Sequence, residues 1–361
     1  MPSQNIYTTS FRGIGQLTGR ELQRALGIRK ENVETHSVRD YDISLFATDA
    51  ASDLVALRTT EDVFFELGRV ELTGHRADTE RIEDLLTASP IEAGITIKRG
   101  FTPKNHPGRP TYRVIVQAED APWRSYRRER LGEAASRAVG SRYRKWRRVD
   151  DDSHIEFWIH LLDRTALVGL RLTDRTMRHR EYKVANLPGS LRPTIAAAAV
   201  QLSKPADDDI FLDPTCGAGT LLLERAYEGP HQMLYGGDIS DEAVSATLTN
   251  FANRHKPWDI RKWDATQLPL DAGSVTRVVT NPPWGRQISA GESVRAYYKS
   301  AVAEIGRILA PWGRLVILTS EWRALQGALK STPSLKIDEQ HKNISVLGRN
   351  ADLFSLIRTD T

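Results

Sequence analysis

An apolar run that ends in an acid and a glycine turn constrains the fold of this chain more than any other feature. Ile210 to Asp213 has the pattern of a strand, Pro214 to Gly219 that of a tight turn, and Leu221 to Ala226 that of a helix. Glycines at such a turn let a ligand approach the backbone, because they carry no Cβ. Predicted strands and helices alternate after it, which indicates an α/β domain with a mostly parallel sheet.

Two acidic residues end predicted strands of this domain, Asp213 and Asp238, which are 25 residues apart, and Asp264 follows 26 residues later. Ligands of open parallel sheets bind at the carboxyl ends of the strands. Leu222 stands where a dinucleotide turn would have its third glycine, which favours S-adenosyl-L-methionine over NAD. Asp238 is placed to reach ribose hydroxyls and Asp264 the adenine amino group. The predicted cofactor-binding residues are Asp213, Thr215, Gly217, Gly219, Asp238, Ile239, Asp264, Ala265 and Asn281.

A second turn, Asn281 to Trp284, follows the predicted strand from Val275 to Thr280. The Asn281 side chain and the Pro282 carbonyl can accept the N–H groups of an exocyclic amine, and Trp284 can stack on a flipped-out base. We therefore predict Asn281, Pro282 and Trp284 as catalytic residues for methyl transfer to nitrogen. The motif does not distinguish guanine N2 from adenine N6. The only cysteine, Cys216, lies in the first turn, so a cysteine-based carbon methylation is not expected.

Basic residues gather between residues 121 and 148, where the net charge is +8 and four aromatic residues are interspersed. Arginines can contact phosphates while aromatic side chains stack on bases, so we predict that this stretch binds RNA. Arg286, beside the second turn, could contact a further phosphate. The predicted RNA-binding residues are Arg124, Arg127, Arg128, Arg142, Arg144, Lys145, Arg147 and Arg286.

The composition is that of a globular protein, with 40% hydrophobic and 27% charged residues. No apolar run is long enough for a membrane span and no signal peptide is evident, so we expect a cytoplasmic protein with no membrane partner. One cysteine and scattered histidines predict no metal site.

Local patterns predict further elements in the first half of the chain. Thr18 to Glu21 has the pattern of a capping box that opens a helix, and Ile95 to Arg99 that of a strand. Ile155 to Leu162 and Ala166 to Leu172 should pair as a β-hairpin around Asp163 and Arg164.

The motifs Asp213 to Thr220 and Asn281 to Gly285 resemble those of the THUMP-domain RNA guanine-N2 methyltransferases. Leu191 to Ala196 resembles the family's segment that enters the catalytic domain, and Leu170 to Thr173 resembles the closing strand of a THUMP module. The resemblance implies four parts: a ferredoxin-like unit at 1–70, a THUMP RNA-binding domain at 71–175, a linker at 176–192, and a Rossmann-like class I methyltransferase domain at 193–361.

The same resemblance implies that S-adenosylmethionine binds near Asp213, Gly217, Asp238 and Asp264. It also implies that Asn281 and Pro282 hold a guanine amine and that the N-terminal domains bind RNA. In the tRNA members the target is guanosine 6 of the acceptor stem. A 23S rRNA branch shares the architecture, but Trp284 stands where that branch usually has Tyr, which favours tRNA. A non-catalytic RNA-binding protein is the other alternative. We expect a monomer.

Overall fold

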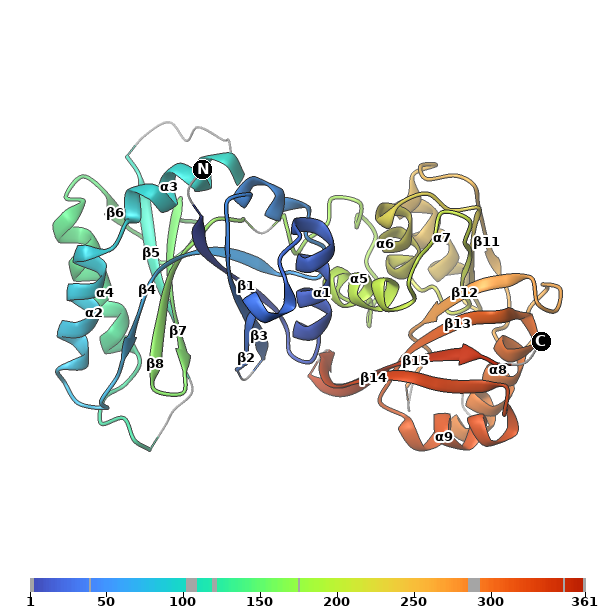
Figure 1. The fold of residues 1–361 in the computed structure, drawn as a ribbon. Coiled ribbons are helices and arrows are strands. Elements are labelled where there is room, and N and C mark those ends of the chain that lie inside the picture. The colour runs from blue at the N-terminus through green and yellow to red at the C-terminus, as the bar shows by residue number, and fades with distance from the viewer. Residues whose placement is uncertain are drawn as a thin grey trace. The chain divides into compact units, whose positions relative to one another are not determined.

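The computed structural model describes residues 3–38, 40–101, 109–118, 122–174, 176–284, 293–346 and 348–359 (Figure 1). The chain forms two compact units. The N-terminal unit consists of residues 1–10 and 18–177, and the C-terminal unit of residues 11–17 and 178–361. Within the described residues, no helix is long and apolar enough to cross a membrane.

One sheet of eight strands runs through the N-terminal unit, in the order β2-β3-β1-β4-β8-β7-β5-β6. Its strands are β1 (Gln4–Phe11), β2 (Glu34–Ser37), β3 (Tyr41–Thr48), β4 (Asp62–Glu71), β5 (Thr111–Gln117), β6 (Arg147–Arg148), β7 (Ile155–Leu162) and β8 (Thr165–Arg171). The helices are α1 (Gly15–Leu26), α2 (Asp78–Ala88), α3 (Ile91–Phe101) and α4 (Glu129–Arg142), with 3-10 turns η1 (Lys30–Asn32) and η2 (Ala51–Ala56). The predicted hairpin is confirmed as β7 and β8.

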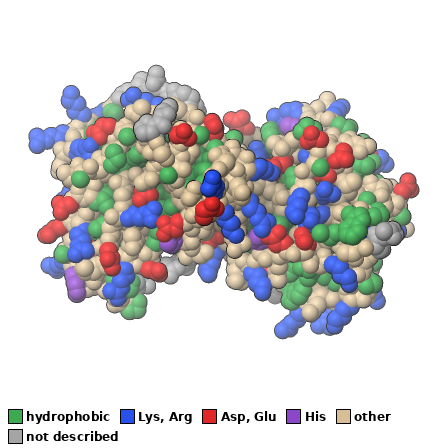
Figure 2. Space-filling model, viewed as in Figure 1, with side chains coloured by type: hydrophobic (Ala, Val, Ile, Leu, Met, Phe, Trp, Pro, Cys, Tyr) green, Lys and Arg blue, Asp and Glu red, His purple; other side chains and the backbone are tan. Residues whose placement is uncertain are grey.

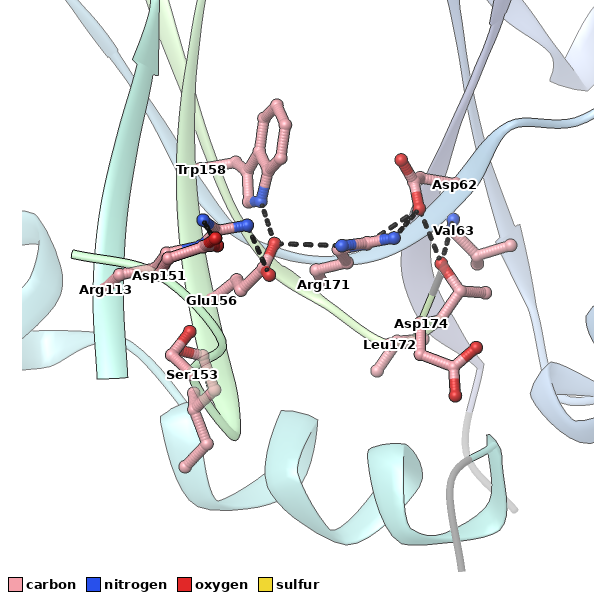
Figure 3. A network of polar contacts seen from close by, with 12 residues as sticks. Asp62, Val63, Arg113, Asp151, Ser153, Glu156, Trp158, Arg171, Leu172 and Asp174 are labelled. Atoms are coloured by element: carbon pink, nitrogen blue, oxygen red, sulfur yellow. Dashed lines mark hydrogen bonds and ion pairs between the residues drawn. The ribbon is translucent and has the colours of Figure 1, made fainter. Parts of the chain in front are cut away.

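A row of paired charges crosses four neighbouring strands of this sheet (Figure 3). Arg171 on β8 donates from Nε to Asp62 on β4, at 2.7 Å, and from a terminal nitrogen to Glu156 on β7, at 3.1 Å. Arg113 on β5 donates to the other oxygen of Glu156, at 2.8 Å. Arg171, Asp62 and Glu156 are buried, and buried charges are tolerated only when paired in this way. Alternating charges on adjacent strands thus help to fix the register of the sheet.

Two local predictions for this unit are wrong. Ile95 to Arg99 is part of helix α3 rather than a strand. Gly94 of this helix lies so close to β4 that a Cβ would fall 2.9 Å from the Phe65 ring, and Lys98 donates to the carbonyl oxygens of Arg171 and Leu172. These tertiary contacts outweigh the strand propensity of the segment.

The second error concerns the start of α1. Helix α1 begins at Gly15, so Thr18 and Glu21 lie inside it and form no capping box. The Glu21 carboxylate instead accepts hydrogen bonds from the backbone amides of Arg58 and Thr59 and from the Thr59 hydroxyl. It therefore anchors a distant loop rather than its own helix end.

A seven-stranded mixed sheet forms the C-terminal unit, in the order β11-β10-β9-β12-β13-β15-β14. The first five strands are parallel, and β15 and β14 add an antiparallel edge. This is the Rossmann-like α/β fold expected from the sequence. The strands are β9 (Ile210–Asp213), β10 (Met233–Asp238), β11 (Trp258–Lys262), β12 (Val275–Thr280), β13 (Leu309–Thr319), β14 (Leu335–Val346) and β15 (Arg349–Arg358). The helices are α5 (Pro193–Leu202), α6 (Thr220–Glu228), α7 (Asp241–Phe251), α8 (Val294–Ile308) and α9 (Trp322–Ser331).

Residues 11–17 belong to the C-terminal unit although they lie near the start of the chain. Ile14 and Leu17 are buried in one apolar core with Ile344 and Leu353 of the β14–β15 hairpin. Gly13 adopts φ +91°, and a Cβ at this position would fall 2.8 Å from the Lys342 carbonyl oxygen. The predicted domain ranges 1–70 and 71–175 contribute strands to one sheet, and their division stays a prediction.

Candidate active site

The strand order reverses between β9 and β12, because the chain leaves β9 toward β10 on one side and returns to β12 on the other. Open α/β sheets bind ligands at this switch point, beyond the carboxyl ends of the strands. A cavity of about 460 Å³ lies there, lined by eight of the nine predicted cofactor-binding residues: Asp213, Thr215, Gly217, Asp238, Ile239, Asp264, Ala265 and Asn281.

Gly217 and Gly219 shape the turn between β9 and α6, with φ +54° and +77°. A Cβ on Gly217 would meet no atom within 4 Å, so this glycine leaves backbone open beside the cavity. Gly219 does not line the cavity. A Cβ there would fall 2.7 Å from the Thr247 side chain, and the Thr247 hydroxyl donates to the Gly217 carbonyl. The second glycine therefore serves the packing of α7 against the turn.

Asp238, at the end of β10, joins two backbone segments around the cavity. One carboxylate oxygen accepts the Gly217 amide, at 2.9 Å, and the other accepts the Ser240 amide, at 3.0 Å. Each oxygen has a further lone pair for a ligand hydroxyl. The carboxylate can therefore hold the cofactor turn and accept from ribose at the same time.

Asp213, at the end of β9, is 1% exposed. Burial, with a smaller contribution from the nearby Asp238 charge, raises the pKa of its carboxyl to about 8, although the amide of Thr215 and the hydroxyl of Thr280 act against the rise. At neutral pH this carboxyl holds a proton in the free protein.

Ile239, Trp263 and Asp264 form another part of the cavity wall. Ile239 lines the cavity and is 67% exposed, so its apolar side chain is available to contact a flat apolar ligand. Trp263 packs against Gly237, where a Cβ would fall 0.7 Å from its Nε1. One oxygen of Asp264 accepts from the amide and hydroxyl of Thr266, which leaves the other oxygen for a ligand amino group.

The second turn brings Asn281 to the cavity. Its Oδ1 is buried and has no hydrogen-bond partner among the described residues, which is costly unless a ligand supplies a donor. Pro283 lines the same cavity, whereas the buried Pro282 lines a small adjacent one. Trp284 is 7% exposed and packs in the apolar core that contains Ile14 and Leu17, so its ring does not line the cavity. Arg286 lies outside the described residues.

The sequence pattern missed one wall of the cavity. Residues 187–191 lie in the range predicted as a linker, yet they line the site. The segment is fixed by Asn250, whose side chain bonds both backbone groups of Ala185, and by Lys183, which donates to the Leu191 carbonyl at 2.6 Å. Pro188 and Gly189 were the only local signal, and they are typical of any turn. Tyr297 of α8 also lines the cavity and was not predicted.

Cys216 is buried in the cofactor turn, and burial raises the pKa of its thiol well above the usual value. A protonated, enclosed thiol is a poor nucleophile. Among the described residues, no group of three His, Cys, Asp or Glu side chains could hold a metal ion.

The predicted RNA-binding residues of the N-terminal unit differ in their contacts. Arg142 donates to the carbonyl oxygens of Leu86, Thr87 and Ser89 at the end of α2 and pairs with Glu92, so its charge is engaged within the unit. Arg124 is half-buried beside the Tyr126 ring. The other five described residues of the predicted set are exposed and are here called the basic surface: Arg127, Arg128, Arg144, Lys145 and Arg147. Basic side chains project at the α2–α4 edge of this unit (Figure 2).

Comparison with known proteins identifies the C-terminal unit. Residues 180–350 match the UPF0020 family, described as "RMKL-like, methyltransferase domain". These residues form a methyltransferase domain of that family. The site's glycine turn, acidic strand ends and open apolar wall fit S-adenosylmethionine, and the domain has the fold of the methyltransferases that use it.

Relatives match much of the chain. It is 30% identical over 233 residues to the human "tRNA (guanine(6)-N(2))-methyltransferase THUMP3", covering 60% of this chain and 45% of the relative. It is 30% identical over 227 residues to the "tRNA (guanine(6)-N2)-methyltransferase" of Thermus thermophilus, covering 62% and 66%. The chain thus spans about half the length of the human relative. The crystal structure of TrmN from Thermus thermophilus aligns with a TM-score of 0.81 at 21% identity, covering 98% of this chain and 99% of that one.

Proposed function

We propose that this protein transfers a methyl group from S-adenosylmethionine to the exocyclic N2 of a guanosine in tRNA, at position 6 of the acceptor stem. The methyltransferase domain supports the reaction class, and the names of the human and Thermus thermophilus relatives support guanine N2 and tRNA. We further propose that the protein acts as a monomer in the cytoplasm.

The observation that carries the proposal is the buried Oδ1 of Asn281, which lies beside the cofactor cavity and has no partner in the part of the chain that the structure describes. The lone pair of a nucleobase amine is delocalised into the ring, so the amine is a weak nucleophile. An acceptor on its N–H favours a geometry in which the lone pair is free to react, and the acceptor is stronger when it is desolvated. Asn281 meets both conditions, and the Pro282 carbonyl is the second acceptor of the proposal.

S-adenosylmethionine, when bound, supplies an electrophilic methyl group. The chain's own residues would then hold the two reactants. Asp238 and the Gly217 turn would bind the ribose, Ile239 and Asp264 would bind the adenine, and Asn281 would orient the amine. The methylated amine is acidic enough to release its proton to the Asn281 carbonyl or to water, so the proposal assigns no separate general base.

RNA binding is assigned to the basic surface. Arg144, Lys145 and Arg147 are exposed and have no ion-pair partner among the described residues, so they are available to phosphates. Arg142 is left out of this assignment, because it already holds the end of α2.

The test is single-turnover methyl transfer to tRNA transcripts with saturating S-adenosylmethionine, followed by mass mapping of the methylated nucleoside. We expect N2-methylguanosine at position 6 and no product when guanosine 6 is replaced by adenosine. Asn281→Ala should lower the rate by about 10²–10³-fold with little change in either affinity, as for loss of one preorganised polar group. Asn281→Asp, which keeps the acceptor, should lose less.

The alternatives give different products. Methyladenosine would identify an adenine-N6 enzyme, and activity on 23S rRNA fragments but not on tRNA would identify the ribosomal branch. A protein that binds RNA but shows no S-adenosylmethionine binding by calorimetry would be a non-catalytic RNA-binding protein. An Asn281→Ala variant with the wild-type rate would show that the amine is held elsewhere.

A further inference from the structure

The two turns of the site are joined by a pair of hydroxyl groups. Strands β9 and β12 are parallel neighbours, with Leu212 opposite Val278, so their ends meet at the same edge. Thr280 is the last residue of β12 and Thr215 lies in the turn after β9, and their Oγ1 atoms are 2.8 Å apart. Thr280 is 2% exposed. The contact is therefore a partly buried hydrogen bond between the cofactor turn and the residue that precedes Asn281.

Packing beneath the turns is incomplete. A cavity of about 10 Å³ lies there, lined by Pro214, Thr215, Thr280, Pro282 and residues of α8. The proline side chains of the two turns border this small space and lose van der Waals contacts on that side, so packing alone holds the turns less firmly there. A directional bond between the turns adds a constraint, because it holds one hydroxyl against the other at a set distance.

We propose that Thr280 is a positioning residue for methyl transfer, which sets the distance between the methyl donor and the amine by bonding to Thr215. The inference rests on the proposed function, since it assumes that Asn281 holds the amine. Thr280 does not line the cofactor cavity, so it acts through the turns rather than by contact with either reactant. A shift of reacting groups by about 1 Å can cost 10²-fold in rate while leaving binding almost unchanged.

The same strand offers a matched control. Thr276, at the other end of β12, also bridges to β9: its Oγ1 accepts the Ile210 amide, at 3.0 Å, and lies 3.2 Å from Asp209 Oδ1. Thr276→Val removes a hydroxyl that joins the same two strands away from the site. It should lower the stability of the unit without changing the methyl-transfer rate.

The experiment measures single-turnover methyl transfer to tRNA at saturating S-adenosylmethionine, with calorimetry for the cofactor and thermal unfolding for each variant. Thr280→Val should slow transfer by about 10–100-fold and change the cofactor dissociation constant by less than about threefold. Thr280→Ser keeps the hydroxyl and should stay within about threefold of the wild-type rate. Thr215→Val should also slow transfer, and the effects of the two valine substitutions should not add, because both remove the Thr215–Thr280 bond. Only Thr280→Val also removes the contact between the Thr280 hydroxyl and Asp213.

The outcomes are distinct. If Thr280→Val transfers methyl groups at the wild-type rate, or Thr276→Val slows transfer as much, or the two valine substitutions add, the positioning role is wrong. If Thr280→Val does not fold, the Thr215→Val and Thr280→Ser rates decide in the same way. A wild-type protein that binds S-adenosylmethionine but methylates no RNA contradicts the proposed function, and the inference falls with it.

Discussion

Replacing Asp213 with asparagine should change how the stability of the methyltransferase unit depends on pH. Burial raises the pKa of this carboxyl from its ordinary 3.8 to about 8. Between these values the folded carboxyl keeps a proton that the unfolded one has released, so stability falls as pH rises. The slope is about 1.4 kcal/mol per pH unit, which gives a loss of about 3 kcal/mol between pH 5 and pH 7.

Asparagine at position 213 has nearly the shape of the protonated acid and does not titrate. The two proteins should therefore be similarly stable below about pH 4, and Asp213→Asn should become the more stable as pH rises through 5 and 7, with no further divergence above about pH 8. The other buried titrating groups, such as His160, whose pKa is lowered by burial to about 3, contribute equally to both proteins and cancel in the difference.

The assay is urea denaturation at several pH values, read from hydrogen exchange in peptides that cover β9, so that the C-terminal unit is followed by itself. A stability difference between the two proteins that stays constant from pH 5 to pH 8 would refute the raised pKa. The reasoning also fails if Asp213→Asn is less stable than wild type at pH 7.

Asp238→Ala should weaken S-adenosylmethionine binding by about 1.5–3 kcal/mol, because the ribose loses a charged acceptor, and calorimetry measures this change. Asp241→Ala, which removes an exposed carboxylate at the start of α7, should not weaken it. Removing basic-surface charges should lower the salt dependence of tRNA binding. The slope of log binding constant against log salt concentration should change by about 0.7–0.9 for each phosphate that is no longer neutralised. Arg142→Ala, in contrast, should mainly lower the melting temperature. The charges to remove are those of Arg144, Lys145 and Arg147. Gly13→Ala should destabilise the C-terminal unit by about 1–3 kcal/mol in thermal unfolding, because Gly13 has a positive φ. Gly19→Ala, whose Cβ would meet nothing within 4 Å, should not destabilise it. Equal effects of the two substitutions would argue against the packing of residues 11–17 in the C-terminal unit.

The parts of the site that follow from sequence are those fixed by strand order. Asp213, Asp238 and Asn281 end their strands or follow them directly, and a parallel sheet brings all such ends to one edge. Their spacing along the chain is therefore enough to predict that they share a cavity. The orphaned Oδ1 of Asn281 agrees with the role predicted for it, although its catalytic part stays a prediction.

Side-chain direction was less predictable. Trp284 directly follows the Asn-Pro-Pro sequence, and an aromatic residue there was expected to face a base. The structure packs it in the core with residues 11–17, a segment about 270 residues away in sequence that no local pattern connects to this turn. Tyr297 lines the cavity instead, from a helix whose first turn carries no signal of a ligand site.

Charge patterns predicted the location of the basic surface but not which charges are available. Arg142 and Arg144 stand two residues apart in one basic run, yet the first holds three carbonyl oxygens at the end of α2 and the second is exposed. The difference depends on where α2 ends relative to α4, which is a tertiary fact. An arginine can satisfy open helix carbonyls as readily as a phosphate, because both present oxygen acceptors to its five donors. A basic run therefore gives an upper limit to the number of phosphate contacts, and a salt-slope measurement on single variants is needed to count those that RNA uses.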